Sequence, residues 1–197
     1  MGRRRFRWRL LGRERRRFWR GGRVRLMVNV RRWFRHVFMP PWAWRRAFPR
    51  ATLDAIEAAI RESETRHGGE IRFAIENSLP ASWIWRGMTG RKRAIEVFSF
   101  LRVWDTEHNS GVLVYLLLAD HDIEIIADRG IAARVEASAW EAVAQTMEAA
   151  FRQGEFGRGV LEGIRQISTL LATHFPPGGR NPDELPDRPV IVPSGYK

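Results

Sequence analysis

The chain has 197 residues, with 34 basic and 22 acidic side chains and a formal net charge of +12. This length favours one domain with flanking segments, and an apolar fraction of 44% is enough for a buried core, which excludes a fully disordered chain. The absence of cysteine excludes disulfides, Fe–S clusters, cysteine-ligated zinc and a thiol nucleophile, and it fits a reducing compartment.

The positive charge is concentrated in the first fifty residues. They hold 18 arginines and one acidic residue, Glu14, whereas the rest of the chain carries a net charge of −5. The longest apolar run, Val112–Ala119, has the length of a strand, so no membrane-spanning helix is predicted. The N-terminal segment also lacks the apolar stretch of a secretory signal. We therefore expect a cytoplasmic protein that is able to lie peripherally at a membrane.

Residues 1–26 form an arginine-rich arm of low complexity. Two interpretations stay open for this arm. It is either an upstream extension produced by a misplaced start codon, with Met27 as the true start, or a real arm that binds polyanions. Arginines interleaved with aromatic rings suit phosphate contact and base stacking, so nucleic acid is expected as a partner only through this arm.

Residues 27–48 form a basic aromatic segment. Apolar residues recur at helical spacing from Leu26 to Phe38, and most of the basic residues lie elsewhere on the helical wheel, which predicts an amphipathic helix that ends before Pro40–Pro41. One interpretation is a helix that docks on an anionic membrane surface. The other is a helix that packs its aromatic face against its own domain.

The folded domain is predicted to span residues 49–175. Its strand–helix–strand unit, over residues 70–119, should be parallel, and the next strand should complete an antiparallel hairpin. The predicted fold class is α/β: a three-layer α/β/α sandwich around a small mixed sheet, with two C-terminal helices. Residues 176–197 form a proline-rich tail that we expect to be extended or disordered. The predicted helices are 52–66, 91–102, 138–151 and 157–174, and the predicted strands are 70–76, 112–119 and 123–127.

Polar side chains gather in residues 104–111, directly before the central strand. The predicted hairpin would bring this loop beside residues 128–130. Carboxylate and amide oxygens suit a hard cation such as Ca²⁺ or Mg²⁺, which could in turn hold a phosphate and activate water. The alternative is a polar loop in which Asp and Asn cap turns and Arg129 neutralises the acids. In the first interpretation the metal ligands are Asp105, Glu107, Asn109 and Asp128, and the phosphate-binding residues are Arg129 and His108.

Several local sequences resemble the TPM domain family, which is named after thylakoid lumen, photosystem-repair and nematode receptor-associated members. The resemblance covers residues 50–175, and residues 104–108 resemble a bacterial subgroup. The matching segments are Gly69–Ile75, Asn109–Tyr115, Asp122–Gly130 and Phe151–Phe156 with Gly159 and Gly163.

The resemblance implies an α/β/α sandwich, a divalent-cation site and weak phosphatase-type activity, with a phosphorylated small molecule or protein as substrate. Other members of the family act as assembly or repair factors for membrane complexes. The alternative function is therefore a non-catalytic module that attaches to a membrane surface or a protein partner through residues 26–48.

Overall fold

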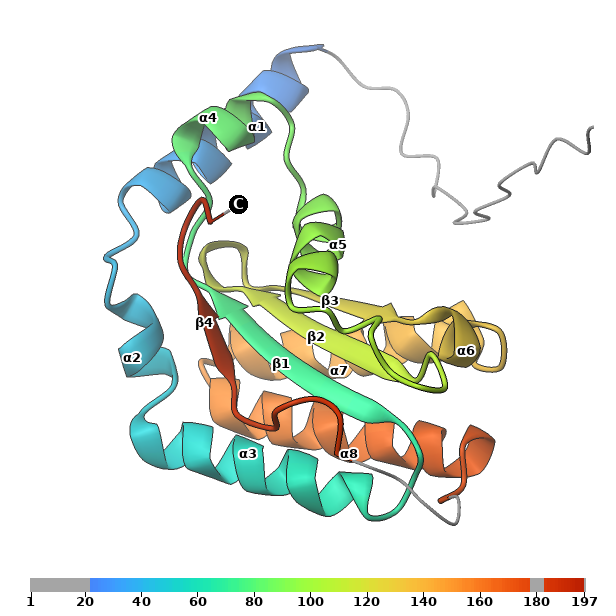
Figure 1. Cartoon of the computed structure of the whole chain (residues 1–197). Coiled ribbons are helices and arrows are strands. Elements are labelled where there is room, and N and C mark those ends of the chain that lie inside the picture. The colour runs from blue at the N-terminus through green and yellow to red at the C-terminus, as the bar shows by residue number, and fades with distance from the viewer. Residues whose placement is uncertain (1–21, 178–182, 197) are drawn as a thin grey trace, which may run out of the picture.

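The computed structural model describes residues 22–177 and 183–196, with side chains from residue 30 onward. Residues 1–21, most of the predicted arginine-rich arm, lie outside the described residues. At the centre is a four-stranded mixed sheet in the order β3-β2-β1-β4 (Figure 1). The strands are β1 (Glu70–Glu76), β2 (Gly111–Leu117), β3 (Asp122–Ala127) and β4 (Val190–Val192). The helices are α1 (Gly22–Val37), α2 (Ala43–Ala47), α3 (Arg50–Glu64), α4 (Ala81–Trp85), α5 (Gly90–Phe100), α6 (Arg129–Ala132), α7 (Ala137–Arg152) and α8 (Phe156–His174), with a 3-10 turn at Leu118–Asp120.

The pairing of the three long strands confirms the predicted topology. β1 and β2 are parallel, from Glu70 opposite Gly111 to Glu76 opposite Leu117. β2 and β3 are antiparallel, with Val112 opposite Ala127. The predicted parallel unit and the predicted hairpin are therefore both present, and the start of β1, the start of β2 and the end of β3 lie at one end of the sheet.

Helices cover both faces of the sheet, which confirms the three-layer α/β/α arrangement. The alternation of side chains along each strand divides the core into two clusters. On one face Ile71, Phe73 and Ile75 pack with α3, α7 and α8, and on the other face Ala74 and Tyr115 pack with α4 and α5 (Figure 1). β1 is buried along its whole length because apolar helices lie against both of its faces.

Of the two expectations for the tail, extended or disordered, residues 183–196 follow the first, and they are part of the fold. Its strand β4 pairs in parallel with β1, with Ala74 opposite Val190 and Glu76 opposite Val192. Leu185 is buried in the core on the α5 side. The segment was missed because β4 has only three residues between two prolines and finds its partner more than a hundred residues away.

The basic aromatic segment lies at the end of the molecule where β1 finishes. α1 runs beside α4, and α2 continues along the same side (Figure 1). The Asn77 side chain, just after β1, donates a hydrogen bond of 2.9 Å to the carbonyl of Pro40. In the described part of the chain, no helix combines the length and apolarity needed to cross a bilayer.

We predict that Leu185→Ala lowers the free energy of unfolding by about 2–3 kcal/mol, because it deletes a buried side chain that joins the C-terminal segment to the core. Chemical denaturation measures the loss. The neighbouring exposed position provides the control, since Arg188→Ala should change the stability by less than about 0.5 kcal/mol. Equal stability of the two variants would show that the segment contributes nothing to the folded domain.

Candidate metal centre at one end of the sheet

One end of the sheet collects polar groups from four segments of the chain. Glu70 opens β1, the loop of residues 104–110 leads into β2, and Asp128 follows β3. The backbone amide of Glu70 donates to the carbonyl of Ser110 at 3.0 Å, so the loop is anchored to the start of β1. Residues 183–187, which precede β4, reach the same end through the contact of Glu184 with Glu107. We refer to this end of the sheet, together with the last residue of α3, Glu64, as the acidic end.

The predicted approach of residues 104–111 to residues 128–130 is confirmed. The amide of Gly130 donates to the carbonyl of Asn109 at 3.1 Å, and Arg129 Nη2 donates to Asn109 Oδ1 at 3.1 Å. A Cβ at Gly130 would lie only 2.6 Å from the carbonyl oxygen of His108. Glycine is therefore needed there, because any side chain would push the two turns apart.

The Asp128 carboxylate is buried between the two turns. Its Oδ1 accepts a hydrogen bond of 2.6 Å from the amide of Arg129 and so caps α6. Its Oδ2 is buried and has no hydrogen-bond partner among the described residues. Part of the capping alternative therefore holds for Asp128, and the cap leaves its second oxygen unused.

The other predicted ligands lie on the exposed side of the loop. Asp105 is exposed, with its carboxylate 3.9 Å from Arg102 Nη1. Glu107 and His108 also have exposed side chains. The backbone amide of Glu107 donates to both carboxylate oxygens of Glu184, at 3.0 and 3.2 Å. The structure thus brings Asn109, Asp128 and Arg129 together and joins the loop to the C-terminal segment.

Three carboxylates converge beside this loop. Oxygen atoms of Glu64, at the end of α3, of Glu70 and of Asp183 lie within 4.8 Å of one another. Glu70 is buried, and its Oε2 accepts hydrogen bonds from the amides of Glu184 and Leu185 at 3.3 and 3.2 Å. Glu64 Oε1 accepts a hydrogen bond of 2.8 Å from the amide of Ile71. Backbone donors from two segments therefore fix two of the three carboxylates.

Burial and crowding raise the pKa values of the two glutamates of this cluster. The pKa of Glu64 is raised to about 9, mainly by burial and to a smaller extent by the nearby Glu70 and Asp187, against the hydrogen bond from Ile71. Burial also raises the pKa of Glu70 to about 7, with smaller contributions from Asp183 and Glu184. Removing a carboxylate from water and placing it beside other carboxylates both disfavour its charged form.

Two arginines border the cluster. Arg61 Nε is 2.9 Å from Asp187 Oδ2, and Arg61 Nη2 is 2.9 Å from Glu57. Arg72 is buried and donates to the carbonyl of Arg188 at 3.0 Å. These contacts fix the segment that carries the acids, yet no ion pair in the described part of the chain joins a basic side chain to Glu70.

Glu76, the other buried glutamate of β1, is held by a buried arginine and provides a comparison for Glu70. Its Oε2 is 2.8 Å from Arg93 Nε and accepts a hydrogen bond of 2.8 Å from the Tyr115 hydroxyl. Glu76 therefore has a buried cation as its partner, whereas Glu70, on the same strand, faces two other acids. A buried charge normally needs a partner of opposite sign, and Glu70, which has no ion pair among the described residues, would obtain one if a cation were bound there.

Sequence reasoning missed Glu64, Glu70 and Asp183 as a group. Glu64 lies near the end of a predicted helix, where acidic residues are common on the surface, so nothing in the sequence distinguishes it. Asp183 lies in the segment expected to be extended or disordered. The available signal was the acidic character of residues 183–187, followed by the short β-branched run Val190–Val192. That pattern is compatible with a strand that pairs with the sheet and places the preceding acidic residues beside it.

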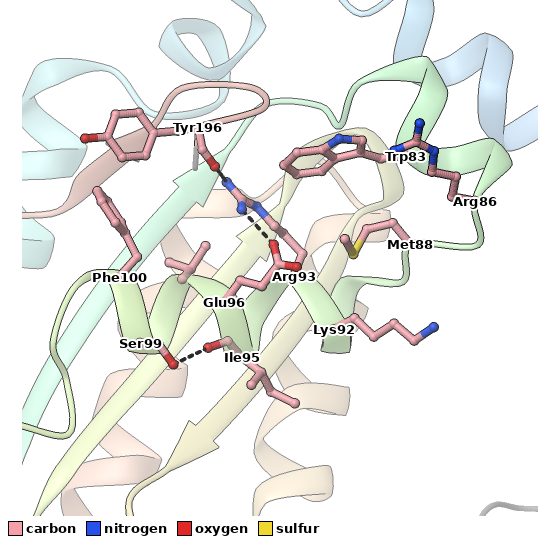
Figure 2. A pocket seen from close by; sticks show the side chains of 11 residues that line it. Trp83, Arg86, Met88, Lys92, Arg93, Ile95, Glu96, Ser99, Phe100 and Tyr196 are labelled. Atoms are coloured by element: carbon pink, nitrogen blue, oxygen red, sulfur yellow. Dashed lines mark hydrogen bonds and ion pairs between the residues drawn. The ribbon is translucent and has the colours of Figure 1, made fainter.

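A cavity of about 650 Å³ lies away from this end, along α5 (Figure 2). Trp83, Met88 and Phe100 supply much of its apolar lining. Its buried cation, Arg93, is already paired with Glu76 and Glu96 and donates to the carbonyl of Tyr196. The cavity therefore has an apolar wall and no convergent set of acids among its lining residues, and the carboxylates that could hold a metal lie at the acidic end.

Comparison with known proteins agrees with this fold. A family model described as the TPM domain matches residues 45–170. The chain is 30% identical to the BA42 protein of the psychrophilic bacterium Bizionia argentinensis, whose NMR structure superposes with a TM-score of 0.66 over 74% of this chain and 95% of that one. The N-terminal domain of a protein from P. gingivalis, 14% identical, shares the fold with a TM-score of 0.54 over 66% of this chain and 82% of that one.

A search of the curated proteins gave no match. The family model nevertheless covers well over half of the chain, and it begins and ends within a few residues of the domain limits expected from the sequence. The matched residues contain β1, β2, β3 and the helices from α3 to α7, together with most of α8. This chain therefore belongs to the TPM domain family.

Proposed function

We propose that this TPM domain binds a divalent cation, Ca²⁺ or Mg²⁺, at the acidic end of the sheet, with Glu64, Glu70 and Asp183 as ligands. The convergence of their carboxylate oxygens within 4.8 Å of one another carries the proposal. Carboxylate oxygens are the donors that these hard cations take in proteins. A cation would also supply a partner of opposite charge for Glu70, which has no ion pair among the described residues. The three carboxylates therefore suit a hard divalent cation.

The loop residues form the second part of the same proposal. Asp105, Glu107, Asn109 and Asp128 lie at the acidic end, and the contact between Glu107 and Glu184 joins the two groups. Asp128 contributes a buried oxygen without a partner among the described residues. We therefore expect the Glu64, Glu70 and Asp183 group to be the primary site, and Asp128 with Asn109 to be a neighbouring position.

We further propose that the domain weakly hydrolyses phosphate monoesters on a small molecule or a protein. A bound divalent cation supplies Lewis-acid polarisation of a phosphoryl oxygen. Arg129 is exposed and held by Asn109, so its guanidinium can bind the negative charge of a phosphate. The exposed His108 on the adjoining turn can donate a proton to a leaving oxygen.

We predict that Glu70→Gln weakens Ca²⁺ or Mg²⁺ binding by at least about tenfold, because it replaces a buried ligand charge with a neutral amide. Isothermal titration calorimetry on the full chain measures this loss. The control is Glu141→Gln, an exposed acid of α7, which should bind as the wild type does. Unchanged affinity in Glu70→Gln together with a large loss in Asp105→Asn or Asp128→Asn would move the primary site to the loop.

We predict that the cation-free protein loses thermal stability as the pH rises from about 6 to about 9. Both glutamates have higher pKa values in the folded protein, about 9 and about 7, than the value of 4.5 expected for the unfolded chain. The folded state therefore binds more protons than the unfolded state in this range, so its stability falls with increasing pH. Melting curves with chelator should show the decline, and saturating cation should remove most of it. A melting temperature that rises over this range would contradict the assignment.

We predict that p-nitrophenyl phosphate is hydrolysed slowly in the presence of Mg²⁺ and that Arg129→Gln lowers this rate by roughly tenfold or more. The exposed Arg152→Gln, at the C-terminal end of α7, serves as the matched control and should leave the rate unchanged. Cation binding without any hydrolysis, or hydrolysis that is unaffected by Arg129→Gln, would remove the phosphatase part of the proposal and leave the cation site intact.

A further inference from the structure

The basic face of α1 is attached to the domain. Arg32 Nε is 2.7 Å from the carboxylate of Asp120, and Arg32 Nη1 donates to the carbonyl of Met88 at 2.6 Å. His36 is buried, and its Nδ1 accepts a hydrogen bond of 2.8 Å from the amide of Leu79. The orientation of this end of the helix is therefore fixed by polar contacts with the domain.

Because these polar groups face inward, several large apolar side chains face solvent. The exposed fractions are 48% for Phe34, 43% for Val37, 72% for Phe38 and 57% for Trp42. The rings of Phe34 and Phe38 stack with centroids 5.7 Å apart and planes 6° apart. We call these four residues the aromatic face. So many exposed apolar side chains within nine consecutive residues mark a surface that binds a partner.

Positive charge surrounds the aromatic face. Arg31, Arg45, Arg46 and Arg50 are exposed, and the sequence contains no acidic residue from 22 to 53. Residues 1–21 add ten arginines and one glutamate. The face lies at the end of β1 opposite to the acidic end, as the position of α1 in Figure 1 shows, so the cluster around Glu70 is directed elsewhere.

We propose that the aromatic face docks this domain on an anionic lipid bilayer, with Phe38 and Trp42 inserted among the headgroups and the neighbouring arginines bound to lipid phosphates. Amphipathic segments that combine Trp and Phe with arginine bind at the membrane interface in this way. The proposal concerns attachment only and is independent of the cation site.

A bilayer fits this face better than nucleic acid does. Phe34 and Phe38 stack on each other, so a base cannot enter between them. Val37 offers no ring for stacking, whereas it adds to the apolar area that a bilayer would cover. The arginines are spread over α1, α2 and the start of α3, and they can neutralise lipid headgroups without having to follow a single strand.

Co-sedimentation of the full chain with vesicles tests the proposal. We expect binding to vesicles of phosphatidylcholine mixed with phosphatidylglycerol, weak binding to phosphatidylcholine alone, and loss of binding at high salt. Phe38→Ser combined with Trp42→Ser should reduce the bound fraction at least about fivefold at low salt, because the inserted apolar area is removed. Phe38→Ser alone provides a milder variant if the double variant melts at a lower temperature.

The control replaces two side chains of similar exposure elsewhere, Ile95 and Trp104, which are 50% and 49% exposed. Ile95→Ser combined with Trp104→Ser should leave vesicle binding unchanged. The proposal is overturned if the Phe38 and Trp42 variant binds vesicles as the wild type does, since arginines alone would then carry the attachment. It is also overturned if the wild type fails to bind vesicles but binds single-stranded RNA, or if it forms a dimer that the same variant dissociates.

Discussion

The register of β1 against β2 is the constraint on which the candidate site depends. Glu70 is placed opposite Gly111 because Ile71, Phe73 and Ile75 must enter the core beneath α3, α7 and α8. A slip of one residue would turn these side chains to the opposite face of the sheet. The hydrophobic core therefore holds Glu70 at the acidic end of the sheet, and the β2–β3 hairpin fixes Asp128 beside Asn109 at the same end.

Charge compensation divides the molecule into two ends with different chemistry. At the far end of β1, Glu76 has Arg93 and Tyr115 as buried partners, and Asp120 has Arg32. Each of these acids has an arginine partner inside the fold. At the near end, Glu70 receives backbone donors from the C-terminal segment and, among the described residues, lies beside other carboxylates without an ion pair of its own. Convergent carboxylates at one end, with acids paired to arginines at the other, are the contrast on which the proposed cation site rests.

The sequence predicts the elements whose side chains repeat with a clear period. Strand 70–76 is recovered at its observed limits, and the short connection Asp120–Asp122 predicts the hairpin that joins the two turns. The C-terminal strand has three residues and pairs with a distant segment, so no local pattern reveals it. The carboxylate group around Glu70 depends on that strand, and it could be found only once residues 183–187 were placed against β1.

The same limit applies to the basic aromatic segment. Helical periodicity predicts α1 but does not tell which face turns inward, because both interpretations use the same residues. The partly buried carboxylate of Asp120 fixes which face of α1 turns inward. It binds Arg32 and lies close to His36, while Phe34 and Phe38 remain exposed. Trp33 contacts Trp85 of the domain, so the aromatic residues are divided between the two sides.

A crystal structure of the protein soaked with Mn²⁺, with anomalous scattering used to locate the metal, tests the cation site most directly. A peak bounded by the carboxylates of Glu64, Glu70 and Asp183 is the result that the account predicts. A protein that takes up Mn²⁺ only at surface acids remote from the start of β1, or that shows no anomalous peak at saturating Mn²⁺, would contradict it.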